Sequence, residues 1–234
     1  MTTHTAVLPF PVTPRSAGGP QADLLGFALI HRALRSGTRD VADAATAIGA
    51  GAPCPPERRA ALVHFAREVF AEIHVHHARE DDVLWPVIAA SAGAVVDLAP
   101  LTDDHLVLVG VLDRAERALA AFAERDADVG SAATLGRVAT ELADGLAEHI
   151  AEEEAEVFPV IREHVSAADF ATVELRFRKG TPLRHLLFTL PWLALQCTPE
   201  ELATLGESAG KPLLVLLRLC SPRWHRRRDL MLGR

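Results

Sequence analysis

The sequence predicts an all-α protein, organised as an antiparallel up-down four-helix bundle with a short helical C-terminal extension. Apolar residues recur at intervals of three and four along four long segments, and the alternation of two that marks strands is nearly absent. Glycines and prolines separate these segments at spacings that suit the short connections of a bundle. After residue 165 the pattern breaks into shorter units. We therefore expect a bundle over residues 20–165 and an extension over residues 166–234.

Each of the four long segments places its apolar residues on one stripe of a helix. The first stripe covers residues 24–48, although the small and polar residues 36–38 are expected to weaken or kink this helix. The remaining stripes cover residues 62–87, 98–122 and 135–160. The predicted connections are residues 49–56, 91–100 and 126–131, each of which contains glycine. Four helices joined by short connections favour antiparallel neighbours.

The extension is predicted to consist of short helices that form a lid, or a surface for a homodimer or another protein partner. A capping box from Thr198 to Glu201 marks the start of one helix, and Trp192 is expected in the core of the extension. The other short helices are expected over residues 166–179, 183–196 and 213–219.

Charge is divided unevenly between these two parts. Residues 1–165 contain 25 acidic and 13 basic side chains, whereas residues 166–234 contain 6 and 11. The acidic balance argues against nucleic acid as a partner of the bundle, and the basic residues 226–228 are expected to be a solvated helix end.

The N-terminal sequence lacks the pattern of a secretory signal, and no apolar run approaches the ~20 residues that span a bilayer. We therefore expect a soluble cytoplasmic protein with no membrane span. Cys54, Cys197 and Cys220 match no metal or redox motif, which suits ordinary reduced thiols.

Six polar residues lie on the apolar stripes, where periodicity alone would place leucines. Burying a carboxylate or an imidazole without a partner costs several kcal/mol, so these side chains must be paired or must coordinate a metal. Because positions i and i+4 share a helix face, two of the histidines each lie beside a glutamate. The six residues are His31, His76, Glu80, His105, His149 and Glu153.

The two halves of the predicted bundle repeat this pattern. The paired histidines follow the preceding histidines by 45 and 44 positions, and residues 80–86 match residues 153–159 at an offset of 73. Both matched segments end in a proline, Pro86 or Pro159, which is expected to bend or end its helix.

The repeat also selects among neighbouring histidines. It favours His76 over His74 and His77, although His77 and Asp81 form another pair at i and i+4. Asp81 and Glu154 are expected to support the ligands or face solvent, because each lies about 100° round the helix from the adjacent ligand.

The doubled motif resembles that of the hemerythrin (HHE cation-binding) family, in which His-x-x-x-Glu-Glu is followed shortly by Leu-Phe-Pro and each preceding helix carries a further histidine. The resemblance covers about residues 20–165. It implies that the six residues bind two metal ions, with Glu80 and Glu153 bridging them, as in the four-histidine, two-glutamate di-iron subfamilies. The implied cofactor is a carboxylate- and oxo-bridged pair of iron ions, while spacing alone is also compatible with manganese or zinc.

Two departures separate this chain from the oxygen-carrying hemerythrins. Val109 stands where they have a second histidine on the third helix, and Glu153 stands where they have an aspartate. With two imidazoles at each metal, a symmetric centre with an open position on both ions is expected. The resemblance then implies a protein that binds or reacts with dioxygen, peroxide or nitric oxide, in oxidative or nitrosative stress or in iron homeostasis.

Other functions remain open at this point. The protein is an enzyme if the centre turns over, as a di-iron oxidoreductase that is catalase-like or reactive towards nitric oxide. One alternative is an iron- or oxygen-responsive sensor without turnover, and another is a di-iron oxygenase whose organic substrate lies against residues 183–217. The sequence contains no tyrosine, which excludes an oxidase that relies on a tyrosyl radical.

Overall fold

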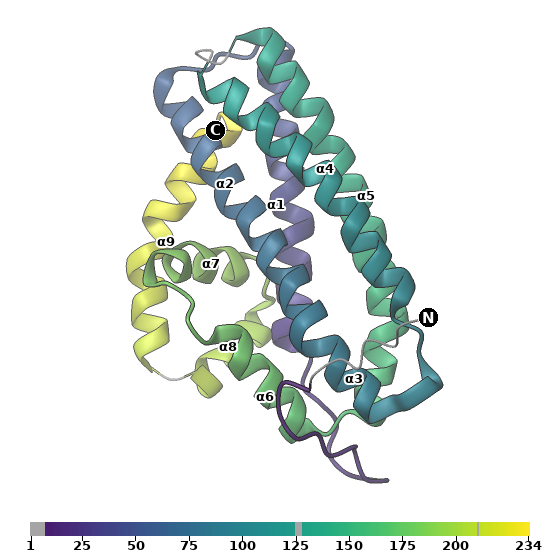
Figure 1. Ribbon diagram of the computed structural model, residues 1–234. Helices are drawn as coiled ribbons and strands as arrows, with labels where there is room; N and C mark the ends of the chain where they lie inside the picture. The colour runs from purple at the N-terminus through teal and green to yellow at the C-terminus, as the bar shows by residue number, and fades with distance from the viewer. Residues whose placement is uncertain (1–7, 125–127, 210) are drawn as a thin grey trace. The chain divides into compact units, whose positions relative to one another are not determined.

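The structure is a computed structural model that describes residues 8–124, 128–209 and 211–234. Throughout these residues the regular elements are helices and no strand occurs, which confirms the all-α prediction (Figure 1). The elements are α1 (Leu25–Gly49), α2 (Pro56–Arg79), the π-helical turn η1 (Glu80–Leu84), α3 (Trp85–Ala92), the 3-10 turn η2 (Gly93–Val95), α4 (Ala99–Glu124), α5 (Val129–His164), α6 (Ala167–Arg178), α7 (Leu183–Leu195), α8 (Pro199–Ala209) and α9 (Lys211–Leu232).

The chain forms two compact units, each assembled from segments that are distant in sequence. Unit 1 draws on Met1–Leu24, His74–Val107 and Glu148–Gly180, and unit 2 on Leu25–Ile73, Leu108–Ala147 and Thr181–Arg234. The helices α2, α4 and α5 therefore contribute a segment to each unit. Residue 165 lies inside unit 1, and the predicted division of the chain at that residue stays a prediction.

In unit 1, a π-helical turn separates α2 from α3. The amide of Trp85 donates to the carbonyl of Glu80, five residues earlier, and α3 resumes with Pro86 in its first turn. Proline lacks an amide proton and its ring clashes with the carbonyl four residues before it, so a helix that contains proline after its first turn is disturbed. Pro86 thus lies at a helix boundary, as the sequence predicts, whereas α5 continues past Pro159 to His164.

In unit 2, α1 is continuous through residues 36–38, where the sequence predicts a weakened helix. The hydroxyls of Ser36 and Thr38 donate to carbonyls one turn earlier, so they are satisfied within the helix. Gly37 is buried, and a Cβ at this position would collide with the indole of Trp192 on α7. The glycine is therefore explained by the close packing of α7 on α1.

Contacts within unit 2 show that α5 runs antiparallel to both α1 and α4. In each pair, the residue numbers of the contacts rise along one helix while they fall along the other, so the two helices run in opposite directions (Figure 1). The contacts are Arg39 with Asp144 and Thr46 with Gly136 for α1 and α5, and Leu108 with Gly145 and Arg114 with Glu141 for α4 and α5.

The C-terminal helices of unit 2 have an aromatic core. Trp192 is fully buried, as predicted, and its ring centroid lies 6.3 Å from that of Phe65 on α2 and 5.4 Å from that of Phe188. The predicted capping box is confirmed: Thr198 Oγ1 accepts from the amide of Glu201 at 3.2 Å, and the Glu201 carboxylate accepts from the amide of Thr198 at 2.9 Å. These contacts fix the start of α8.

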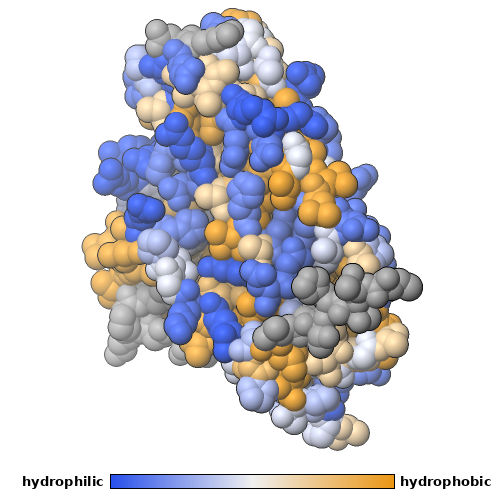
Figure 2. All heavy atoms as spheres, in the orientation of Figure 1, coloured by the Kyte–Doolittle hydropathy of each residue, from blue (hydrophilic) through white to orange (hydrophobic). Residues whose placement is uncertain are grey.

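The described surface mixes hydrophilic and apolar side chains (Figure 2). Apolar side chains gather over α9, where Leu214, Val215 and Leu219 are exposed. Within the described ranges, every helix is too short or too polar to cross a membrane.

Candidate metal centre

The predicted ligands are among the most buried polar side chains of the molecule. Five of them lie in unit 1: His76 on α2, Glu80 on η1, His105 on α4, and His149 and Glu153 on α5. None of the five exceeds 3% exposure, and the two glutamates have none. The sixth, His31, lies on α1 in unit 2, where it is fully buried and its ring centroid lies 4.5 Å from that of Phe27.

A first donor group of unit 1 combines an imidazole with the two carboxylates. One ligand atom from each of His76, Glu80 and Glu153 lies within 4.8 Å of the others. The closest approach joins His76 Nε2 to Glu80 Oε1 at 3.0 Å, because residues four apart share one helix face. This geometry is the one that the sequence predicts for the first His-x-x-x-Glu pair.

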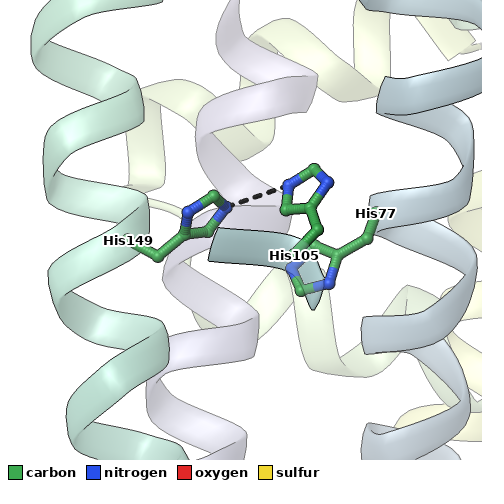
Figure 3. Close-up of side chains that lie close together, drawn as sticks. All are labelled: His77, His105 and His149. Atoms are coloured by element: carbon green, nitrogen blue, oxygen red, sulfur yellow. Dashed lines mark hydrogen bonds between the residues drawn. The ribbon is translucent and has the colours of Figure 1, made fainter. Parts of the chain in front are cut away.

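A second donor group consists of three imidazoles from three helices. His77, His105 and His149 each offer a nitrogen within 4.8 Å of the others, and their rings face a common space (Figure 3). His105 Nε2 and His149 Nε2 are 3.1 Å apart, while the ring of His77 stacks on that of His105 with centroids 4.2 Å apart.

His77 is the member of this group that the sequence interpretation did not include among the ligands. It is 4% exposed, and its Nε2 atom is buried without a hydrogen-bond partner among the described residues. The signal for it was present, because the spacing of His77 and Asp81 repeats the spacing of His76 and Glu80. Adjacent residues lie about 100° apart round a helix, so a helix with a wide buried face turns both imidazoles inward.

The two glutamates lie between the donor groups. Glu80 directs one oxygen to His76 and the other, at 3.5 Å, to His105 Nε2. Glu153 belongs to the first group and also approaches His149 Nε2 at 3.9 Å. Each carboxylate therefore reaches both groups, which is the placement that a bridging ligand requires.

Burial keeps two of the imidazoles neutral. It lowers the pKa of His77 to about 2, helped by the neighbouring imidazoles of His76 and His105. It also lowers the pKa of His149 to about 4, helped by His105. A neutral imidazole keeps a lone pair on one nitrogen, which is the form that binds a metal ion.

The chemistry of the donors fits a transition-metal ion. Imidazole nitrogen suits zinc, copper, iron and nickel, and carboxylate oxygen extends the range to manganese. Val109 on α4 is 37% exposed and offers no donor atom. The fifth imidazole of the two donor groups is that of His77, which lies on α2.

Comparison with known proteins agrees with the buried donors. The family model of the hemerythrin HHE cation binding domain matches residues 27–161, which is more than half of the chain. Searches of curated proteins and of solved structures found no match. The resemblance seen in the doubled motif is thereby confirmed, and the chain belongs to the hemerythrin HHE cation-binding family.

Proposed function

We propose that the protein binds two iron ions in this centre and uses them to bind or react with a small oxidant, either dioxygen, peroxide or nitric oxide. The proposal rests on the two adjoining donor groups. Glu80 and Glu153 are fully buried members of the first group, and each also approaches a histidine of the second group. A role in oxidative or nitrosative stress, or in iron homeostasis, follows from that chemistry.

The ligands divide between the two ions by donor group. One ion takes His77, His105 and His149, and the other takes His76 together with His31, whose assignment rests on the family motif and its complete burial. Glu80 and Glu153 would serve both ions, because each approaches both donor groups. The domain that holds the centre is the antiparallel four-helix bundle of the sequence prediction, which the antiparallel helix pairs of unit 2 support.

The fifth histidine makes the two ions unequal. Three imidazoles are available to one ion and two to the other, which differs from the symmetric centre that four histidines imply. When bound, iron supplies a coordination position and redox capacity for the small ligand. The ion held by His76 has fewer protein ligands, so that side of the centre is the place for the oxidant.

Several apolar residues within five positions of the candidate ligands along the chain are buried. Leu84, Leu101, Ile150 and Val157 of unit 1 have no exposed surface, and Trp85 is 6% exposed. A dry apolar surround strengthens the interaction between the carboxylates and a cation and protects reactive species from solvent.

Reaction with each oxidant tests the proposal directly. Protein loaded with Fe²⁺ without oxygen is mixed with dioxygen, hydrogen peroxide or nitric oxide, and the optical spectrum and the consumption of oxidant are followed. We expect a spectral change at a stoichiometry of one small ligand per metal pair. The variant that combines His76→Ala with His149→Ala should lose it, and His74→Ala, which lies near the centre and outside both donor groups, should keep it. An iron-loaded wild type that is inert to all three oxidants would contradict the proposal.

A sensor without turnover is the second candidate, and one contact in unit 2 favours it. His185 on α7 contacts both Glu68 and Glu72 on α2, and Glu72 lies one turn before His76 on the same helix. The extension is thus attached to a helix that carries metal ligands. For a sensor, iron should alter the amide hydrogen exchange of α7 while no oxidant is consumed.

A further inference from the structure

Two aspartates contact the outward nitrogens of two candidate ligands. Asp81 Oδ1 lies 3.1 Å from Nδ1 of His105, and Asp104 Oδ2 lies 3.8 Å from Nδ1 of His149. Both imidazoles are almost fully buried, whereas the aspartate side chains are 35% and 45% exposed. Each aspartate therefore connects a buried ring to the surface of unit 1.

Only the Asp81 contact is short enough for a hydrogen bond, and it fixes which nitrogen of His105 carries the proton. A carboxylate accepts hydrogen bonds, so Nδ1 of His105 is the donor, and Nε2 of the neutral ring holds the lone pair. The 3.8 Å between Asp104 and His149 is an ion-pair distance, and Nδ1 of His149 has no hydrogen-bond partner among the described residues.

The two Nε2 atoms lie 3.1 Å apart. The lone pair of His105 Nε2 therefore faces His149, and Glu80 Oε2 lies 3.5 Å from the same nitrogen. A cation bound among these atoms and His77 would be attracted by the lone pair and by the carboxylate.

Asp81 is itself held in place. Thr102 Oγ1 on α4 donates to Asp81 Oδ1 at 3.5 Å, so the carboxylate and the histidine it contacts are tied to the same helix. The ring of Trp85, one turn after Asp81, lies within 15° of parallel to His105 with a centroid distance of 6.2 Å. The orientation of His105 is thus restrained at its edge and along its face.

We infer that Asp81 is a positioning residue of the metal centre, which holds His105 with its Nε2 lone pair directed at a metal ion. This inference rests on the proposed function. A carboxylate behind an imidazole fixes the tautomer and raises the basicity of the ligand, and loss of such a partner typically lowers metal affinity by about 10–100-fold.

Neighbouring residues provide matched controls. Asp82 and Asp103 are exposed and directly adjacent to Asp81 and Asp104, so their substitution by asparagine changes the charge equally. The four variants Asp81→Asn, Asp104→Asn, Asp82→Asn and Asp103→Asn are titrated with Fe²⁺ in competition with a chromophoric chelator. We expect about a 10-fold loss of affinity for Asp81→Asn, a smaller loss for Asp104→Asn because its contact is longer, and less than a 2-fold change for the two controls.

Co²⁺ provides a second readout, because its visible bands report ligand geometry independently of affinity. The bands should shift in Asp81→Asn and should return towards the wild type in Asp81→Glu, which restores the carboxylate. If the wild type loads iron and Asp81→Asn keeps the same affinity and the same Co²⁺ spectrum, the inference is overturned and the proposed function is left standing. A wild type that binds no iron overturns both.

Discussion

Glu80 and Glu153 are the residues whose burial most needs a compensating charge. Both carboxylates have no exposed surface, and the imidazoles of His77 and His149 beside the centre are kept neutral by burial. Removing an ionised carboxylate from water costs several kcal/mol unless it is paired or bound to a metal. A metal cation held by these two carboxylates would offset part of that cost.

Glu153→Gln should accordingly stabilise the metal-free protein and weaken its response to metal. We expect the free energy of unfolding without metal to rise by about 1–3 kcal/mol, because an amide of the same shape is cheaper to bury than a carboxylate. Urea unfolding with and without Fe²⁺ measures both effects, and Glu152→Gln, exposed and adjacent, is the control. A metal-free variant that is less stable than the wild type would show that the carboxylate is satisfied by protein groups alone.

Gly37 is a second position where one residue decides the packing. Gly37→Ala places a Cβ against the Trp192 ring, and we expect a loss of about 1–3 kcal/mol in the free energy of unfolding, the usual range for an overpacked core. Gly110 on α4 has open space around its Cβ position, so Gly110→Ala should be neutral or stabilise by up to about 1 kcal/mol. In thermal unfolding, Gly37→Ala should unfold at a lower temperature than the wild type and Gly110→Ala at the same or a higher temperature, and equal shifts would contradict this packing.

Residue types on the apolar stripes were predictable where the chain repeats itself. His76 and Glu80 were found from their match to His149 and Glu153. His77 was passed over because its equivalent in the second half is Ile150, which has no exposed surface and no donor atom. A repeat identifies what the two halves share, and a candidate ligand that only one half supplies is found only in the three-dimensional structure.

At the scale of elements, His185 holds α7 to α2. Its ring lies between Glu68 and Glu72, and no local pattern in the sequence joins positions more than 100 residues apart. The hydrogen bond to Glu72 raises the pKa of His185 above its usual value, with a further contribution from Glu68 and against the opposing effect of burial. This contact therefore depends on pH.

The sign follows from the direction of the shift. A pKa that is higher in the folded than in the unfolded protein stabilises fully below the unfolded value of about 6.5, and the contribution is lost as pH rises through the folded value. At pH 6 we expect His185→Gln to lower the free energy of unfolding by about 1–2 kcal/mol, the usual worth of a charge-assisted hydrogen bond that is partly exposed. The difference should shrink towards pH 9.

Urea unfolding at a series of pH values tests this, with His225→Gln as the control. His225 is exposed on α9, and its substitution should leave the stability unchanged at every pH. A destabilisation by His185→Gln that is the same at pH 6 and pH 9 would mean that the imidazole acts by shape and not by charge.

Helix existence was more predictable than helix detail. Apolar periodicity and local caps predicted eight helical segments, and the Thr198 box predicted the start of α8, because these signals lie within a few residues. In the described residues, the predicted segment 62–87 is divided among α2, η1 and the start of α3. The π-helical turn at Glu80 and the unbroken path of α1 through Gly37 depend on what packs against each helix. Propensity alone cannot supply that information.

Across the whole molecule, metal binding would be linked to folding. The donor groups of unit 1 combine residues from α2, η1, α4 and α5, so an ion that binds them favours the folded chain over the unfolded chain. A ligand at 100 times its dissociation constant stabilises the folded state by about 2.7 kcal/mol. Thermal unfolding should therefore move to higher temperature as iron is added.

The most direct test of the central claim is the metal content of the purified protein, measured together with its unfolding temperature. We predict two iron ions per chain and an unfolding temperature that rises by several degrees on iron loading. Both should be lost when His76→Ala is combined with His149→Ala, and both should be kept in His74→Ala. A wild type that binds no metal, and whose unfolding temperature is the same with and without iron, would contradict the account.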